Sequence, residues 1–112
     1  MTGWKLRRLN QCAKCPWKVG VDPHDIPDGY SVDAHRALSR TIAEPGSLAR
    51  TQAAMQCHEH GPDDPAHCVG WLHNQIGHGN NIRLRLSVMS CKNIRGMKVT
   101  GQQHERFEDT LP

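Results

Sequence analysis

The feature that most constrains this chain is a set of four cysteines in two pairs, set in a sequence with few large apolar side chains. The first pair is the C-x2-C of Cys12 and Cys15, and the second is Cys57 and Cys68. Val, Ile, Leu and Phe together account for only 20 of the 112 residues, which makes a weak hydrophobic core. A small domain with a weak core needs another constraint, and a bound metal ion is one such constraint.

Four cysteines are enough for one tetrahedral thiolate site. We therefore predict one metal ion, Zn²⁺, held by Cys12, Cys15, Cys57 and Cys68. Structural zinc supplies on the order of 10–16 kcal/mol in small peptides, which matches or exceeds the roughly 5–15 kcal/mol of stability of a whole domain. The sequence therefore predicts a fold that depends on its metal.

Two alternatives stay open for this site. The four thiolates have the ligand chemistry of an iron–sulfur cluster as well. A histidine close to the second pair is also a suitable fourth ligand in place of one cysteine. The plainer interpretation is that these histidines are solvated or lie behind the ligands without binding the ion. These histidines are His58, His60 and His67.

A catalytic zinc site is a further hypothesis, raised by Cys57-His58-Glu59. Zinc-dependent nucleotide deaminases carry His-x-Glu followed by Pro-Cys-x-x-Cys. Here the C-x-x-C comes first, and Cys57-His58-Glu59-His60 does not reproduce the motif. We therefore expect a protein that is not an enzyme.

The chain is expected to be cytoplasmic, without a membrane segment. No apolar run approaches the roughly 18 residues of a membrane span, and the N-terminus lacks the apolar stretch of a secretion signal. In the cytosol thiols stay reduced, so paired cysteines favour a metal over disulfides. Cys91, the fifth cysteine, is then an idle thiol.

The charges are unevenly distributed although the net charge is only +3. Basic residues gather over 5–18 and 83–98, and acidic residues over 22–33, 59–64 and 105–109. A mild net charge is weak support for nucleic-acid binding. Four basic side chains near the end of the chain are predicted to contact phosphate or a partner, with a solvated helix face as an equal alternative. They are Arg83, Arg85, Lys92 and Arg95.

Two helices are predicted in the first half of the chain. Ser31 is a good N-cap for a helix over 32–43, which Pro45 and Gly46 end. Ser47 is a cap for a short second helix that reaches about residue 55. His35 falls on the apolar side of the first helix, so we expect a core histidine.

Two more helices are predicted in the second half. Val69, Leu72 and Ile76 have helical spacing, which predicts a helix over 69–77. Asn80 or Asn81 caps the next helix, whose inner stripe is expected to be Ile82, Leu86 and Met89. Trp17 and Trp71 each lie near a cysteine pair and are expected to cover the metal core rather than to stack on bases.

These elements predict a small, mainly α-helical, loop-rich fold with short β elements. It is expected to be one metal-stapled domain over 1–112, with a basic arm over 1–11 and a polar tail over 100–112.

The motifs also resemble those of a family of small uncharacterised proteins from phages, prophages and some bacteria, a domain of unknown function. The shared pattern is C-x-x-C-P-W, then C-H, then C-x-G-W, then N and R, over roughly residues 10–90. It starts at Cys12, continues through Cys57-His58 and Cys68-Val69-Gly70-Trp71, and ends at Asn81 with Arg83 or Arg85. The resemblance implies the same four cysteine ligands and a phage or mobile-element setting.

Together these observations predict a small zinc-binding, non-enzymatic protein that acts in the cytoplasm of a bacterial host by binding a host protein, for example as a defence inhibitor. The first alternative is a zinc-finger-like module that binds nucleic acid through the basic ends. The second is an iron–sulfur protein with a redox or enzymatic role. The sequence names neither the partner nor the oligomeric state.

Overall fold

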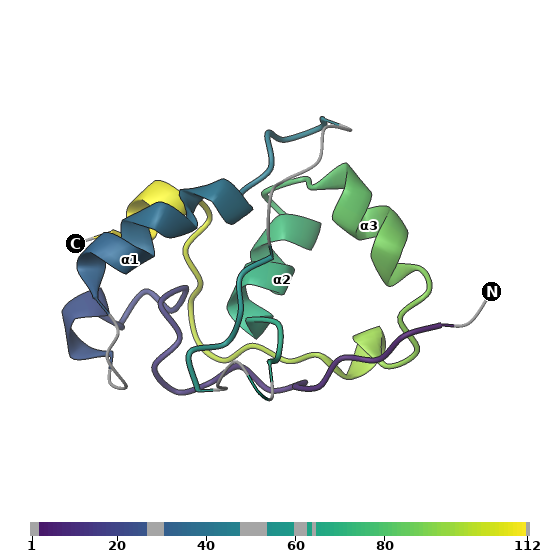
Figure 1. The fold of residues 1–112 in the computed structure, drawn as a ribbon, viewed down its shortest axis with the longest axis horizontal. Coiled ribbons are helices and arrows are strands. Elements are labelled where there is room, and N and C mark those ends of the chain that lie inside the picture. The colour runs from purple at the N-terminus through teal and green to yellow at the C-terminus, as the bar shows by residue number, and fades with distance from the viewer. Residues whose placement is uncertain (1–2, 27–30, 48–53, 60–62, 64, 112) are drawn as a thin grey trace.

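The described part of the chain forms three short α-helices joined by long, irregular connections. The computed structural model describes residues 3–26, 31–47, 54–59, 63 and 65–111. Within these residues, helix α2 (Val69–Ile76) lies between α1 (Val32–Ala37) and α3 (Ile82–Val88) (Figure 1). Short 3-10 turns and isolated β-bridges account for much of the remaining order. The prediction of a small, mainly helical, loop-rich fold is confirmed.

Helix α1 begins where the sequence predicts and changes character before its predicted end. Ser31 Oγ accepts the backbone N–H of Ala34 at 3.1 Å, so the predicted cap is confirmed. After Ala37 the chain continues as the 3-10 helix η2 (Leu38–Thr41). The Thr41 hydroxyl donates to the Leu38 carbonyl at 2.7 Å, and such local bonds compete with α-helical pairing. The helix predicted from Ser47 falls mainly on 48–53, outside the described residues.

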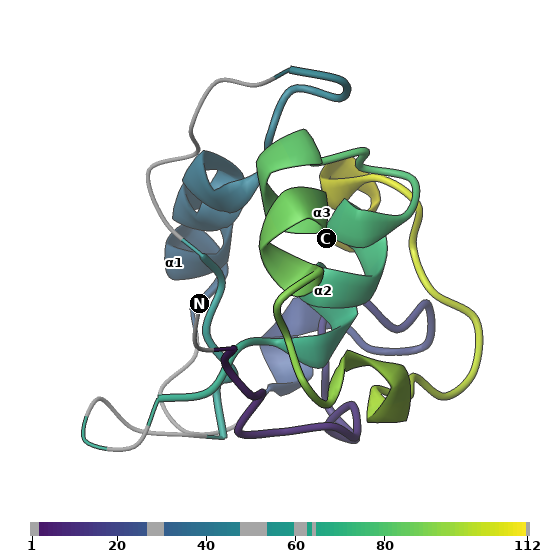
Figure 2. The same ribbon diagram turned by 90° about the vertical axis from the view of Figure 1, so that its right-hand side faces the viewer.

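Helices α2 and α3 follow the prediction at their boundaries. α2 starts directly after Cys68 and ends at Ile76, one residue before the predicted end. α3 is capped by Asn81, whose side chain accepts the Leu84 backbone N–H at 3.1 Å. Figure 2, which views the molecule from its α3 side, shows α3 in front of α2.

The predicted inner stripe of α3 is wrong. Leu86 is 58% exposed and Met89 is 81% exposed, whereas Leu84 and Val88 pack against the core. The segment from Ile82 to Met89 has apolar residues on more than one face. Helical spacing alone is therefore compatible with two inner stripes, one with Leu86 and Met89 and one with Leu84 and Val88. Contact with α2 selects the stripe that contains Leu84.

The two ends of the chain are packed into the molecule. The N-terminal segment runs along the bottom of the molecule beside the segment after α3 (Figure 1), with parallel bridges from Trp4 to Cys91 and from Asn10 to Lys98. In the segment predicted as a polar tail, Phe107 is buried in the 3-10 helix η4 (Phe107–Thr110), which lies beside α1. His35 stacks on Phe107, with ring centroids 5.2 Å apart.

The core gathers around the cysteines. Besides the sulfur side chains, its largest members are Trp17 and Trp71, each buried as predicted. Each indole finds a hydrogen-bond acceptor: Trp17 Nε1 donates to Met55 Sδ at 3.4 Å, and Trp71 Nε1 donates to the Thr41 carbonyl at 3.0 Å. Because both rings are buried, neither is available to stack on bases.

Candidate metal centre

Two local structures position the cysteines. In the first, the chain turns tightly at the C-x2-C, where the Cys15 N–H donates to the Cys12 carbonyl at 3.2 Å. In the second, the segments on either side of the 57–68 loop pair through an isolated antiparallel bridge between Gln56 and His67. Cys57 N–H donates to the Ala66 carbonyl at 2.7 Å, and Cys68 N–H donates to the Met55 carbonyl at 2.9 Å. The loop is therefore closed at its base, which brings Cys57 and Cys68 together.

Gly70 lets helix α2 approach the C-x2-C turn. A Cβ atom at this position would lie 2.6 Å from Cys15 Sγ, 2.7 Å from Trp17 Cβ and 2.8 Å from Gln11 Nε2. All three distances are far shorter than ordinary van der Waals contact. The C-x-G-W sequence therefore places a cysteine at the N-cap of α2 and removes the side chain that would push the first pair away.

The four sulfurs form a chain of contacts. Cys15 Sγ lies 3.8 Å from Cys68 Sγ, which matches the edge of a tetrahedron with Zn–S bonds of about 2.3 Å. Cys12 interacts with both Cys15 and Cys57 through their side chains. The order of contacts is thus Cys57, Cys12, Cys15, Cys68, and no three of these sulfurs lie within 4.8 Å of one another in the described structure. All four thiols are free and buried.

A second set of ligand atoms meets this chain at Cys12. Among the described residues, one group of three metal-ligating side chains has all its ligand atoms within 4.8 Å of one another: Cys12, His58 and Glu59. His58 Nε2 lies 3.3 Å from Cys12 Sγ. This group could hold a metal ion. The sequence prediction included His58 as an alternative ligand but gave Glu59 no role as one.

Arg8 affects the Glu59 end of the group. Arg8 Nη1 donates to Glu59 Oε1 at 3.0 Å, so this carboxylate already has a cationic partner. Arg8 also attracts the ionised forms of Cys57 and Cys12. A thiolate cluster around a divalent ion carries net negative charge, which a nearby guanidinium offsets. Arg8 thus interacts with the Glu59 carboxylate and with the sulfurs of Cys12 and Cys57.

The thiols share protons along the chain. Contact with the Cys12 thiol lowers the pKa of Cys15 to about 3 and that of Cys57 to about 6. The same contacts raise the pKa of Cys12, and contact with Cys15 raises the pKa of Cys68. Among these coupled thiols, the thiolate is favoured at Cys15 and Cys57, and the thiol is favoured at Cys12 and Cys68. Thiolate metal sites require ionised sulfurs.

Backbone amides support the ionised sulfurs. The sulfurs of Cys15, Cys57 and Cys68 accept backbone N–H groups from Trp17, Glu59 and Trp71, respectively, and each bond lowers the pKa of its thiol. Hydrogen bonds to the charged form of a ligand stabilise that form. The residues that follow each cysteine thus favour metal-binding thiolates.

The other predicted site residues lie elsewhere. His67 is half-buried and stacks on Trp71 with centroids 6.4 Å apart, and His60 lies outside the described residues. Arg85 is exposed, and its Nε donates to the Ile76 carbonyl at 2.6 Å, so it satisfies the end of α2. The other three predicted contact residues are also exposed: Arg83, Lys92 and Arg95.

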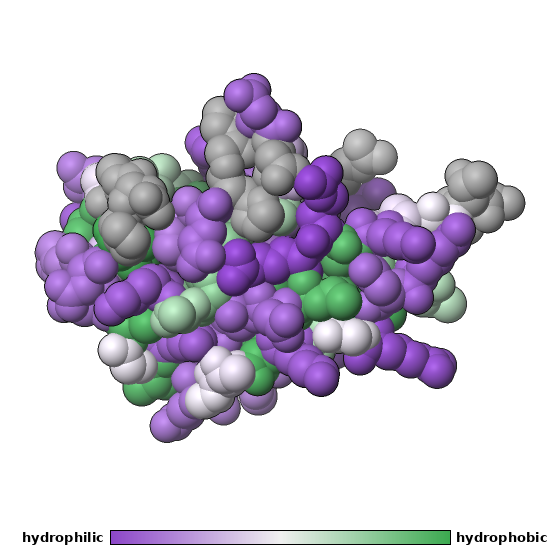
Figure 3. Space-filling view, turned by 90° about the horizontal axis from the view of Figure 1, so that it is seen from below, coloured by the Kyte–Doolittle hydropathy of each residue, from purple (hydrophilic) through white to green (hydrophobic). Residues whose placement is uncertain are grey.

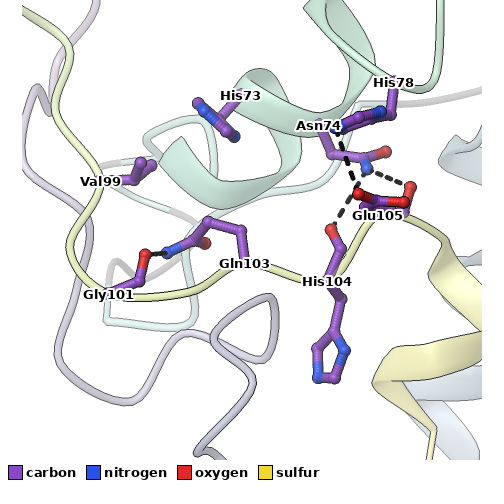
Figure 4. Close-up of a pocket in the computed structure, with 8 residues that line it drawn as sticks. All are labelled: His73, Asn74, His78, Val99, Gly101, Gln103, His104 and Glu105. Atoms are coloured by element: carbon purple, nitrogen blue, oxygen red, sulfur yellow. Dashed lines mark hydrogen bonds and ion pairs between the residues drawn. The ribbon is translucent and has the colours of Figure 1, made fainter.

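A pocket of about 280 Å³ lies away from the cysteines, between α2 and the segment around residue 104. His78 Nε2 lies 3.7 Å from Glu105 Oε1, and Asn74 Nδ2 donates to the Glu105 carbonyl at 2.7 Å. The His104 ring points away from His73 and His78 (Figure 4). The three imidazoles around this pocket therefore do not converge on one point.

Comparison with known proteins gives a family and no activity. Residues 7–110 match the model of a family described as a family of unknown function, DUF6283. No curated protein and no solved structure matches the chain. No helix among the described residues has the length and apolar character to cross a bilayer.

Proposed function

Because the chain belongs to DUF6283, a family of unknown function, we propose its function from the site itself: it is a small zinc-binding, non-enzymatic protein that presents a metal-stapled surface to a macromolecular partner. The observation that carries the proposal is the 3.8 Å separation of Cys15 Sγ and Cys68 Sγ. These residues are far apart in sequence, and their sulfurs lie at the distance that tetrahedral zinc requires.

The proposed ligands are Cys12, Cys15, Cys57 and Cys68. In this arrangement His58 donates a hydrogen bond to the Cys12 sulfur, which the 3.3 Å distance supports. Four thiolates close the coordination sphere, and a closed site leaves no position for a substrate. The proposed role of the ion is therefore structural: it replaces part of the hydrophobic core that the chain lacks.

The biological setting of this proposal comes from the sequence resemblance. It favours a phage, prophage or mobile-element protein that works in the cytoplasm of a bacterial host. A host protein, such as a component of a defence system, is the partner this setting favours. Nucleic acid is the second candidate, and the arrangement of basic residues favours it.

The test is elemental analysis of freshly purified protein and single Cys→Ser variants. We expect one zinc per chain, lost or strongly reduced in variants of the four ligand cysteines. Cys91→Ser is the matched control, because Cys91 is a buried thiol that donates to Asn93 Oδ1 at 3.4 Å. Full metal content in Cys57→Ser would contradict the ligand set.

Two further variants separate the alternatives. His58→Gln and Glu59→Gln should keep full zinc content if both residues lie outside the coordination sphere. Loss of metal in both variants, with Cys68→Ser unaffected, would instead assign the ion to the group formed by Cys12, His58 and Glu59. A brown sample with absorbance near 400 nm after oxygen-free purification would indicate an iron–sulfur cluster.

A further inference from the structure

The charges of this chain are divided between two kinds of segment. The stretches 1–21 and 65–104 contain ten of the 14 Lys and Arg residues and none of the 11 Asp and Glu residues. The rest of the chain has four basic and eleven acidic residues. The two acid-free stretches thus carry a formal charge of +10, and the remainder carries −7. The net charge of +3 conceals this separation.

The fold places the two acid-free stretches side by side. The Trp4 N–H donates to the Ser90 carbonyl at 3.0 Å, and the Lys92 N–H donates to the Trp4 carbonyl at 2.7 Å. Further along, the Lys98 N–H donates to the Leu9 carbonyl at 2.8 Å. The N-terminal segment and the segment after α3 run along the bottom of the molecule in Figure 1. Figure 3 views this underside, where hydrophilic side chains surround small, separate apolar groups.

Basic side chains next to this pairing are exposed. Trp4 and Cys91 form an isolated parallel bridge. Lys5 and Lys92 each follow one of these bridge partners, and both are exposed, whereas Cys91 is buried. Lys98, itself a bridge partner of exposed Asn10, is also exposed.

Some basic residues of the two stretches already have structural roles. Arg8 pairs with Glu59, and Arg85 caps α2. Five others are exposed and make no ion pair with any described residue. We call these five the basic ribbon: Lys5, Lys14, Lys92, Arg95 and Lys98.

The length of the ribbon suits a nucleic-acid backbone. The six residue steps from Trp4 to Asn10, which include Lys5 of the ribbon and a bend at Arg7, span at most about 20 Å at about 3.3 Å per residue. One DNA strand places a phosphate every 3.4 Å or so along its axis, so about six phosphates cover the same length. A linear array of like charges thus faces a linear array of opposite charges. Long lysine side chains contact phosphates without reading bases.

We propose that the basic ribbon binds the phosphodiester backbone of nucleic acid without preference for base sequence. This inference deepens the proposed function and rests on it, because the metal site holds the turn that carries Lys14 next to the paired segments. Trp17 and Trp71 are buried, so these two rings add no base stacking.

The test measures binding of the zinc-loaded full chain to labelled 20-residue oligonucleotides by fluorescence anisotropy. The probes are duplex DNA, single-stranded DNA and single-stranded RNA, in 50–200 mM KCl. Five phosphate contacts predict a slope of log affinity against log salt near −4.5 for duplex DNA and near −3.5 for single strands, at about 0.9 and 0.7 per contact, respectively. The probe that is bound most tightly at equal salt identifies the preferred form.

A pair of charge-matched variants tests whether nucleic acid binds at the basic ribbon. The ribbon variant removes three exposed positive charges: Lys92→Ala, Arg95→Ala and Lys98→Ala. The control removes three exposed positive charges outside the acid-free stretches: Arg36→Ala, Arg40→Ala and Arg106→Ala. Both variants have the same net charge.

We expect the ribbon variant to bind at least about tenfold more weakly and to lose about 2.7 units of the duplex slope, with the control within threefold of wild type. Equal weakening of both variants, or no binding of any probe in 50 mM KCl, would overturn the inference. If no probe binds, a stoichiometric complex with a host protein becomes the better explanation of the exposed basic residues. Zinc content and unfolding midpoint, measured on the same samples, separate this failure from a failure of the metal site.

Discussion

Replacement of Gly70 by alanine tests whether the cysteine turn and helix α2 pack as closely as the structure shows. The new Cβ atom would meet Cys15 Sγ at 2.6 Å and Trp17 Cβ at 2.7 Å. Neither atom is the end of a long flexible side chain, so the helix or the turn must move by about 0.8 Å to restore ordinary contact at 3.4 Å. The movement acts directly on a proposed metal ligand.

The size of the effect is set by two opposing terms. Overpacking of a close contact costs about 1–3 kcal/mol, while alanine in place of glycine within a helix gains up to about 1 kcal/mol. We expect a net loss of about 1–2 kcal/mol in the free energy of unfolding. A displaced Cys15 sulfur should also weaken zinc binding by about tenfold, which corresponds to about 1.4 kcal/mol.

The assay is urea unfolding with zinc in excess, together with zinc competition against a chromophoric chelator. The midpoint should fall by about 0.5–1 M urea. Gly20→Ala is the control, because nothing lies within 4 Å of the Cβ atom it adds, and it should leave both the midpoint and the zinc affinity unchanged. Wild-type behaviour of Gly70→Ala in both assays would refute the close packing of α2 on the cysteine turn.

Three further predictions follow from other parts of the structure. Removal of zinc by a strong chelator should unfold the protein or lower its stability by several kcal/mol, seen as loss of helical circular dichroism that returns when zinc is added. Burial lowers the pKa of His35, so its stabilising contribution is present above the unfolded pKa of about 6.5 and is lost as pH falls below it. The unfolding free energy of the wild type should therefore fall with decreasing pH by up to about 1.4 kcal/mol per unit more than that of His35→Gln, and parallel pH profiles would contradict this. Asn81→Ala should cost about 1–2 kcal/mol, because it removes the cap of α3 and the hydrogen bond from Asn81 Nδ2 to Gln75 Oε1 at 3.2 Å; thermal unfolding measures it, and an unchanged midpoint would show that the cap is dispensable.

Local chemistry made the helix starts predictable. Ser31 and Asn81 accept amide hydrogens within their own first turns, and a cap of this kind needs only neighbouring residues. The buried face of α3 was not predictable in the same way. Its apolar residues fit two stripes, and the choice of Leu84 and Val88 over Leu86 and Met89 depends on contact with the rest of the fold.

The features of the candidate site were likewise predictable where they are local in sequence and not predictable where they depend on distant residues. The two cysteine pairs and the neighbouring His58 were recognisable from spacing, because ligand types and short loops are local properties. The 3.8 Å approach of Cys15 to Cys68, the place of Glu59 beside Cys12 and its pairing with Arg8 involve residues far apart in sequence. Spacing carries no information on such distances.

By itself the sequence determined which residue types are available: four paired thiols, a small stock of apolar side chains, and two long stretches without acidic residues. Only the tertiary structure decided that parts of those two stretches lie against each other and that their lysines Lys5, Lys92 and Lys98 are exposed there. The reason is that electrostatic potential depends on distance in space. Charges separated by some 85 residues along the chain, such as Lys5 and Lys92, act together only after folding has placed them side by side.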